Sequence, residues 1–315
     1  MAKFVPRTNL KGLKASVHEV RTTSGFLLLD AKNSYPKPKR DDPFAKVKLG
    51  MMNRLPRQEG SFRAIMNKAI YDFDTAVLVA EHHRGRLPNG KLKSDRQAIV
   101  EAKLRQIVSN SMNQISTLIQ NNMRSSVKTY LRTITAQSPN KLLSMAEVNN
   151  LSSLYAEEAF NERYGSSGMN VEGRMAGLAG RLEIELRKFI DLSWKERQEK
   201  KKVLRRNLVD PKGSDRPCVA RGAARINRTE QQRAVQKAAL RVLEDKGVTL
   251  AYWRLSASHK DYGGNEVCEV LASSTGARVE DLVMDRPIDL TGCYRVDDFP
   301  LTPHPNCMCN IVPIY

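Results

Sequence analysis

Three side chains near the end of the chain, those of His304, Cys307 and Cys309, can bind a metal ion. Imidazole nitrogens and thiolates are the usual ligands of tetrahedral zinc, and a structural zinc site needs four of them. Cys268 or His259 could supply the fourth ligand. A structural zinc site is therefore one of three interpretations that the residue types leave open. Two alternatives remain open: thiols that pack as small apolar groups beside a hydrogen-bonded His304, or a disulfide between Cys268 and Cys307 or Cys309.

The same side chains could in principle form a catalytic cysteine–histidine pair. The sequence, however, has no glycine-rich nucleotide loop, no nucleophile elbow and no His-Glu-x-x-His zinc motif. It also lacks the His-x-Glu and Pro-Cys-x-x-Cys motifs of zinc deaminases. His82 and His83 lie at the end of a predicted amphipathic helix, where we expect a surface position. We therefore expect no enzymatic activity.

The segment that must position the cysteines and histidines begins after a turn-rich stretch at residues 210–217. A helix is predicted over residues 219–246 and ends at Gly247. Residues 248–255 alternate between apolar and polar types, which is typical of a strand. Short apolar pieces follow at residues 282–284 and 311–314. Residues 217–315 are therefore predicted to form a small α+β domain.

Helical periodicity dominates the chain before this segment. Apolar residues recur every three or four positions over residues 61–85, 94–134, 144–163 and 172–208, and we expect a helix over each range. The second range has no Pro or Gly before Pro139, although a break near residues 109–111 would divide it into two helices. Helices of such length are typical of extended assemblies. The predicted fold is thus mainly α, with an elongated long-helix body over residues 61–210.

Residues 1–60 are predicted to form a partly irregular arm. Residues 31–43 contain three prolines and several charges, and proline disfavours helix. A short apolar run at residues 26–29 could dock as a strand or a turn of helix. We expect the arm to order only on a partner.

The formal net charge of +18 favours an acidic partner such as nucleic acid. Part of this charge is concentrated near the end of the last body helix, where a phosphate-binding face and a merely solvated basic face are equally compatible with the pattern. The candidate nucleic-acid contacts are Lys195, Arg197, Lys200, Lys201, Lys202, Arg205 and Arg206. Few aromatic residues are interleaved with them, which argues against base stacking as the main mode of contact.

Composition also bears on the compartment. No run of about 18 apolar residues indicates a transmembrane helix, and the N-terminus has no secretory signal core, so we expect synthesis in a cytoplasm and no membrane partner. The five cysteines are an odd number in a large chain, which makes a disulfide framework an unfavoured explanation.

Three pieces of the last hundred residues occur in a telling order. A helix that carries Arg228, Thr229 and Glu230 precedes a strand centred on Trp253. A segment with Cys268 follows, and His-Pro-Asn-Cys-Met-Cys, which contains Pro305, lies near the end of the chain. This order resembles the C-terminal module of the phage Mu F-like head morphogenesis proteins, over roughly residues 219–312. Many members have a Cys-x-x-Cys after the tryptophan strand, whereas Cys268 has no such second cysteine.

The resemblance implies a structural minor head protein of a tailed bacteriophage, located in the virion at the portal vertex or capsid interior. Its implied partners are the portal protein, capsid or scaffold proteins and, non-specifically, genomic DNA. Its implied role is in head assembly and in DNA packaging or exit. The alternative that the residues leave open is a free nucleic-acid-binding protein with a zinc-stabilised C-terminal domain.

Overall fold

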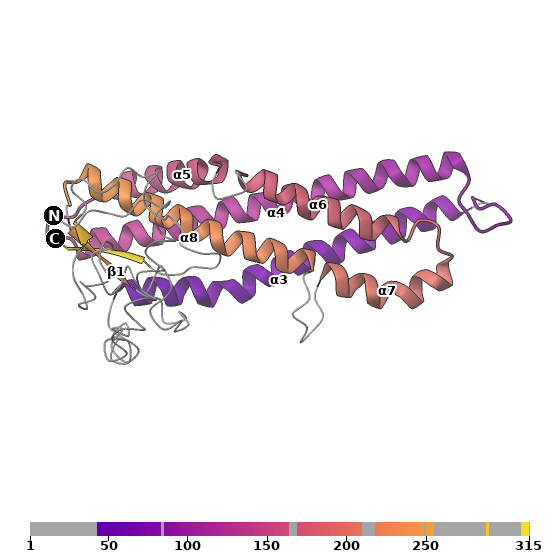
Figure 1. Ribbon diagram of the computed structural model, residues 1–315, viewed down its shortest axis with the longest axis horizontal. Coiled ribbons are helices and arrows are strands. Elements are labelled where there is room, and N and C mark those ends of the chain that lie inside the picture. Colours follow the sequence, from indigo (N-terminus) through magenta and orange to yellow (C-terminus); the bar gives the residue numbers. More distant parts are fainter. Residues whose placement is uncertain are drawn as a thin grey trace, which may run out of the picture. The chain divides into compact units, whose positions relative to one another are not determined.

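The computed structural model describes residues 43–82, 85–163, 169–209, 218–248, 250–254, 288–289 and 310–314 (Figure 1). These residues are mostly helical, as the periodicity predicted. The structure contains long antiparallel helices and short strands, and each forms for a reason that is visible in its sequence.

Helix α3 spans Pro43–Glu81 and begins well before the predicted start at residue 61. Proline fits the first turn of a helix because the amide hydrogen that it lacks has no partner there. Pro56 lies inside the helix and is tolerated. The apolar side chains of Phe62, Met66 and Phe73 recur at helical spacing and are fully buried.

Helix α4 spans Ser94–Gln137 without a break, so the two-helix alternative is wrong. At 44 residues it is about 66 Å long. A tight turn precedes it: Gly90 adopts a positive φ of 82°, and Arg86 pairs with Leu92 across the turn. The buried face of the helix includes Leu104, Ile115 and Ile119.

The remaining body contains three shorter helices, α5 (Met145–Asn161), α6 (Val171–Arg187) and α7 (Trp194–Leu208). The sequence predicted a single helical segment over residues 172–208, but the structure divides it. Ser193 begins α7 with a capping box, in which its hydroxyl accepts from the Glu196 amide and its own amide donates to the Glu196 carboxylate at 2.8 Å. This local signal outweighs the apolar periodicity that continues across the break.

Helix α8 spans Val219–Asp245, close to the predicted range, and ends at Gly247 with a positive φ of 69°. Three strands follow: β1 (Leu250–Arg254), β2 (Ile288–Asp289) and β3 (Asn310–Ile314). They form an antiparallel sheet in the order β2-β1-β3. In this register Trp253 on β1 is opposite Ile311 on β3.

The chain divides into two compact units that alternate along the sequence. One unit contains residues 1–52, 123–159 and 229–315, and the other contains residues 53–122 and 160–228. The sequence had instead predicted consecutive segments with boundaries at residues 60 and 217. The reason for the difference is that α3, α4 and α8 each supply residues to both units, so the periodicity of these helices contains no boundary.

Candidate functional site

Helices α3 and α7 are joined by a network of buried charges within the second unit. The guanidinium of Arg197 donates to the Glu81 carboxylate, with Nη2 2.8 Å from Oε2, and its Nε lies 3.3 Å from Asp74 Oδ1. Only 3% of the Arg197 side chain is exposed. Asp74 also accepts from the Lys201 ammonium at 3.0 Å. Two of the seven cations predicted to contact nucleic acid, Arg197 and Lys201, are thus engaged by α3.

Arg86 extends the network to the turn before α7. It forms an ion pair with Glu81 and donates to the Leu192 carbonyl oxygen at 2.7 Å. Burial raises the pKa of Glu81, but hydrogen bonds and charge from Arg197 and Arg86 more than offset this and hold the pKa below its ordinary value. The carboxylate is therefore ionised at neutral pH, and the network links three segments of the unit.

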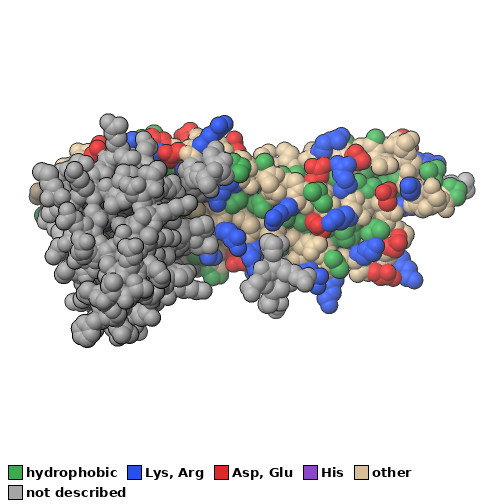
Figure 2. Space-filling view, in the orientation of Figure 1, with side chains coloured by type: hydrophobic (Ala, Val, Ile, Leu, Met, Phe, Trp, Pro, Cys, Tyr) green, Lys and Arg blue, Asp and Glu red, His purple; other side chains and the backbone are tan. Residues whose placement is uncertain are grey.

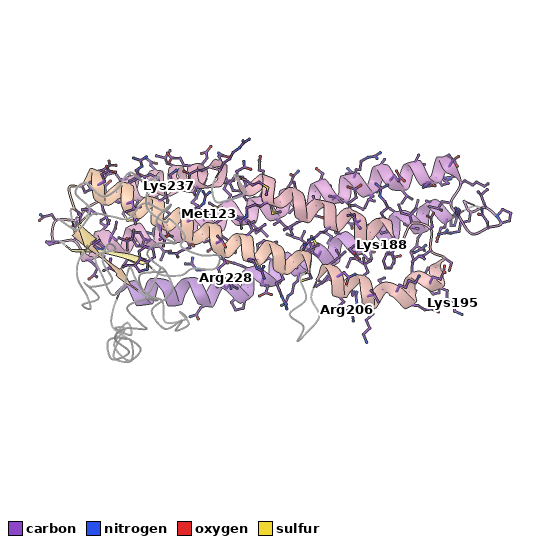
Figure 3. All side chains as sticks on the ribbon, in the orientation of Figure 1. Met123, Lys188, Lys195, Arg206, Arg228 and Lys237 are labelled. Carbon is purple, nitrogen blue, oxygen red and sulfur yellow. The ribbon has the colours of Figure 1, made fainter. Side chains whose placement is uncertain are left out.

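The other five predicted cations lie on the solvent side of α7. Figure 3 shows Lys195 near the start of the helix and Arg206 near its end. Exposed side chains on this face are Lys195, Lys200, Lys202, Arg205 and Arg206. The prediction of a basic helix face thus stays possible for these five, whereas Arg197 is buried in an ion pair and is not available to an external phosphate.

Exposed apolar side chains accompany these cations, and sequence analysis did not single them out. Trp194 and Val203 on α7 are 56% and 47% exposed, and Tyr71 and Val79 on α3 are 69% and 67% exposed. A lone exposed apolar residue needs no explanation, but a cluster of them is typical of an interaction surface. The sequence could not predict that these side chains lie near one another, because the contact between α3 and α7 joins residues that are far apart in the chain.

The Arg228-Thr229-Glu230 motif lies on α8, where the helix becomes buried. Thr229 and Glu230 are buried, and Arg228 is half-buried. Glu230 forms an ion pair with Arg233 at 3.0 Å, with neither side chain exposed. Every residue from 229 to 240 is buried although many of them are polar. Buried charges persist when they are paired, so we interpret Glu230 of this motif as a structural residue of the first unit.

Side chains of α4 form hydrogen bonds with some of the polar side chains of α8. In the first unit the Ser126 hydroxyl donates to Gln231 Oε1 at 2.8 Å. In the second unit, Asn122 Nδ2 donates to Asn227 Oδ1 at 3.0 Å. Asn227 in turn donates to Gln58 on α3 at 2.9 Å. Sequence analysis missed these amides because polar residues on a helix are ordinarily expected at the surface.

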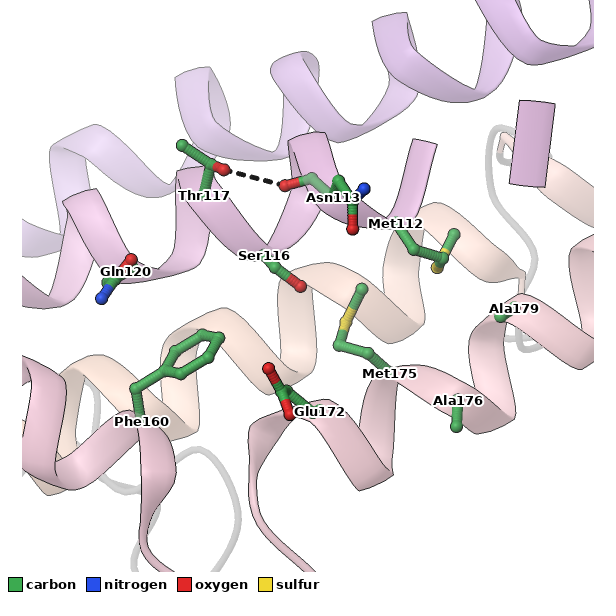
Figure 4. A pocket seen from close by; sticks show the side chains of 10 residues that line it. All are labelled: Met112, Asn113, Ser116, Thr117, Gln120, Phe160, Glu172, Met175, Ala176 and Ala179. Atoms are coloured by element: carbon green, nitrogen blue, oxygen red, sulfur yellow. Dashed lines mark hydrogen bonds between the residues drawn. The ribbon is translucent and has the colours of Figure 1, made fainter. Parts of the chain in front are cut away.

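A groove in the second unit lies between α4 and α6 (Figure 4). Its volume is about 510 Å³, which is large enough for a small ligand. Buried Met112, Met175 and Phe160 form its apolar part, and Asn113 and Glu172 line its polar part. Glu172 is its only charged side chain, and the residues present contain no catalytic pair.

The predicted zinc ligands His259, Cys268, His304, Cys307 and Cys309, and Pro305 of the same motif, lie outside the described residues. The sheet nevertheless pairs Arg254, the last residue of β1, with Asn310, the first residue of β3. The C-terminal end of β1, the strand of Trp253, therefore lies next to the N-terminal end of β3, the strand that follows the cysteines. Among described residues no group of three His, Cys, Asp or Glu side chains is arranged to bind a metal.

The distribution of charge on the described surface is mixed. On the face shown in Figure 2, Lys and Arg side chains are interspersed with Asp and Glu over the described helices. None of those helices contains a stretch that could cross a membrane.

Comparison with protein families, with curated proteins and with solved structures found no match to the chain.

Proposed function

We propose that the protein is a structural minor head protein of a tailed bacteriophage. In this role it associates with the portal vertex or the capsid interior and aids head assembly and DNA packaging or exit. The proposal combines the resemblance of residues 219–312 to the Mu F-like module with a mainly helical body. The finer fold that we propose is a small α+β domain at the end of this body.

The observation that carries the proposal is the pairing of β1 with β3. It brings the Trp253 strand against the strand that follows His-Pro-Asn-Cys-Met-Cys, so two separated parts of the resembling segment belong to one sheet. The Tyr130 hydroxyl on α4 donates to the Ile311 carbonyl oxygen at 2.7 Å and ties this sheet to a long helix. A module built into a helical body suits a structural component.

The test is co-expression of the full chain with the portal, capsid and scaffold proteins of its own genome. We expect the purified particles to contain the chain at low copy number by quantitative mass spectrometry. A chain that is absent from particles, and is recovered free instead, would contradict the proposal. Whole-segment deletion is a poor control, because removing residues 217–315 takes α8 from both compact units.

The alternative, a free nucleic-acid-binding protein, is favoured by the exposed cations of α7. It predicts binding to duplex DNA without any head protein, with an affinity that falls steeply as salt is raised. Neutralising Lys202 and Arg206 together would lower the slope of log affinity against log salt by about 0.9 for each lost phosphate contact. A salt slope that is unchanged in this variant would exclude these two residues as phosphate contacts.

The zinc hypothesis for the C-terminal cysteines is tested directly on the purified full chain. A structural zinc site predicts stoichiometric zinc that is lost when Cys307 or Cys309 is replaced by serine. Thiol alkylation under denaturing conditions separates the two alternatives, because a disulfide protects its cysteines and packed thiols do not resist the reagent. Zinc-free protein with all thiols reactive would leave packing as the explanation.

A further inference from the structure

A strip of exposed apolar and basic side chains follows the contact between α3 and α7. The Asp74–Lys201 ion pair, at 3.0 Å, lies at its centre. Tyr71 precedes Asp74 by three positions and Leu78 follows it by four, so all three lie on one side of α3. We call this strip, together with its counterpart on α7, the α3–α7 seam.

The α7 side of the seam contains Trp194, Lys201 and Arg205. Arg205 is one helical turn after Lys201, and Trp194 is two turns before it, so the three side chains share one face. Because Arg197 contacts both Asp74 and Glu81 while Lys201 contacts Asp74, the helices are antiparallel here. Two antiparallel helices with a shared open face leave a shallow channel into which a third helix packs in many helix bundles.

The seam exposes much apolar surface. Tyr71 is 69%, Trp194 is 56% and Leu78 is 40% exposed. In the antiparallel register, Trp194 lies towards the Leu78 end of the seam, and Tyr71 lies on the other side of the Asp74–Lys201 ion pair. Two of these three exposed side chains are aromatic. Aromatic residues, tryptophan and tyrosine above all, are the side chains that contribute most to protein–protein interfaces. Their placement therefore indicates a protein partner.

Charge decides the nature of that partner. Arg205 is exposed on the seam, and Lys195, Lys202 and Arg206 are exposed beside it, each one position after a seam residue of α7. None of these four forms an ion pair with another described residue. A second copy of the chain would present the same positive face, and residues 1–42 are themselves rich in lysine and arginine. An acidic surface complements the seam, whereas either of these occupants would be repelled.

Nucleic acid fits the seam less well than protein. Leu78 offers nothing to a phosphate or a base edge, and Asp74 and Glu199 place negative charge within or beside the strip. Interfaces with DNA are more polar and more uniformly positive than this surface. We propose that the α3–α7 seam is the docking site for an acidic amphipathic helix of a neighbouring head protein. The identity of that partner class rests on the proposed function.

The test compares particle incorporation of the full chain and its variants during co-expression with the portal, capsid and scaffold proteins. The seam variant is Tyr71→Ser with Leu78→Ser. Its matched control is Leu154→Ser with Ile184→Ser, because these two residues are also exposed apolar side chains and lie on other helices. Circular dichroism checks that both variants are as helical as the wild type. The same proteins are also titrated with a 30-base-pair DNA duplex.

We expect the seam variant to be incorporated about tenfold less than the wild type, or less still. The control variant should be incorporated normally. Both variants should bind DNA as the wild type does. A second variant, Lys202→Glu with Arg206→Glu, should also be lost from particles, whereas Lys103→Glu with Arg105→Glu on α4 should not.

Three other outcomes overturn the inference in different ways. Equal incorporation of the seam variant and its control would remove the seam as a docking site and leave the proposed function standing. If the seam variant loses both DNA binding and incorporation, nucleic acid rather than a protein helix occupies the seam. Absence of the wild-type chain itself from particles would contradict the proposed function and, with it, a head protein as the partner.

Discussion

The Tyr130 hydroxyl donates a 2.7 Å hydrogen bond to the carbonyl oxygen of Ile311, a residue 181 positions later in the chain. Both residues are buried, and Ile311 is paired with Trp253 in the sheet. One side chain of α4 therefore fixes the position of β3 within the first unit.

Replacement of Tyr130 by phenylalanine tests this bond. The variant keeps the ring but leaves the Ile311 carbonyl without this donor, so we expect a loss of about 1 kcal/mol in the free energy of unfolding. Urea unfolding followed by circular dichroism provides the measurement. Tyr71→Phe, at an exposed hydroxyl, is the control and should unfold like the wild type. Equal stability of both variants would show that the bond contributes nothing.

Arg197 is the second test, because its charge is buried between two carboxylates. Arg197→Met fills similar space but removes a buried partner of Glu81 and Asp74, which keep only their ion pairs with Arg86 and Lys201. Breaking a buried pair by removing one partner is strongly destabilising, and we expect a cost of about 3 kcal/mol. The control, Lys195→Met on the exposed face of the same helix, should change the free energy of unfolding by less than about 0.5 kcal/mol. A similar small change at Arg197 would refute the proposed role of the network.

Glu81 makes the stability of the protein depend on acid. Its pKa is lower in the folded chain than its ordinary value of 4.5, so the unfolded chain binds this proton more readily. The stabilisation is therefore complete above about pH 4.5 and is lost as the pH falls through the lower folded value. We expect Glu81→Gln to be less stable at neutral pH and to have a shallower loss of stability between about pH 5 and about pH 3. The free energy of unfolding is measured with urea at each pH. The same pH dependence in the wild type and in Glu81→Gln would contradict this prediction.

The ionisation of Tyr155 affects the protein at alkaline pH. Burial, together with the negative charges of Asp245 and Glu158, raises the pKa of its hydroxyl to about 12. Because the folded state holds this proton more tightly, its contribution to stability is complete below pH 10 and is lost as the pH rises towards 12. An ultraviolet titration should show a phenol that ionises near pH 12 and disappears in Tyr155→Phe. An identical titration curve for the variant would disprove the assignment.

The sequence predicted the helices best where apolar periodicity and turn residues agree. The predicted bounds of α8 agree with the structure because Gly247 follows its apolar run. The predicted range of α4 agrees because nothing interrupts its buried face. The start of α3 was predicted too late, because the prolines of residues 31–43 indicated an irregular arm, although Pro43 is accommodated in the first turn of the helix. At Ser193 a capping box ends a pattern that periodicity alone would continue.

The candidate sites were harder to predict because they depend on contacts between distant residues. Composition indicates that residues 195–206 are basic, but only the partner helix determines that Arg197 and Lys201 face inward. The presence of the exposed Tyr71 and Trp194 on two helices that pack together has the same origin. For α8, a row of Glu, Gln, Arg and Lys predicts a solvated face, and the burial of Glu230 with Arg233 follows from packing that no local pattern encodes.

The interleaving of the two compact units has a consequence for synthesis on the ribosome. Residues 53–122 and 160–228, which form the second unit, are all made before residue 229 is added. That unit can close while the chain is still being extended, whereas the first unit needs residues 229–315 and waits for the C-terminus. The second half of α4 and α5 up to residue 159 therefore lack their partners from α8, β1 and β3 until those later segments have been made. A ribosome stalled after residue 228 would carry one folded unit and one exposed apolar face.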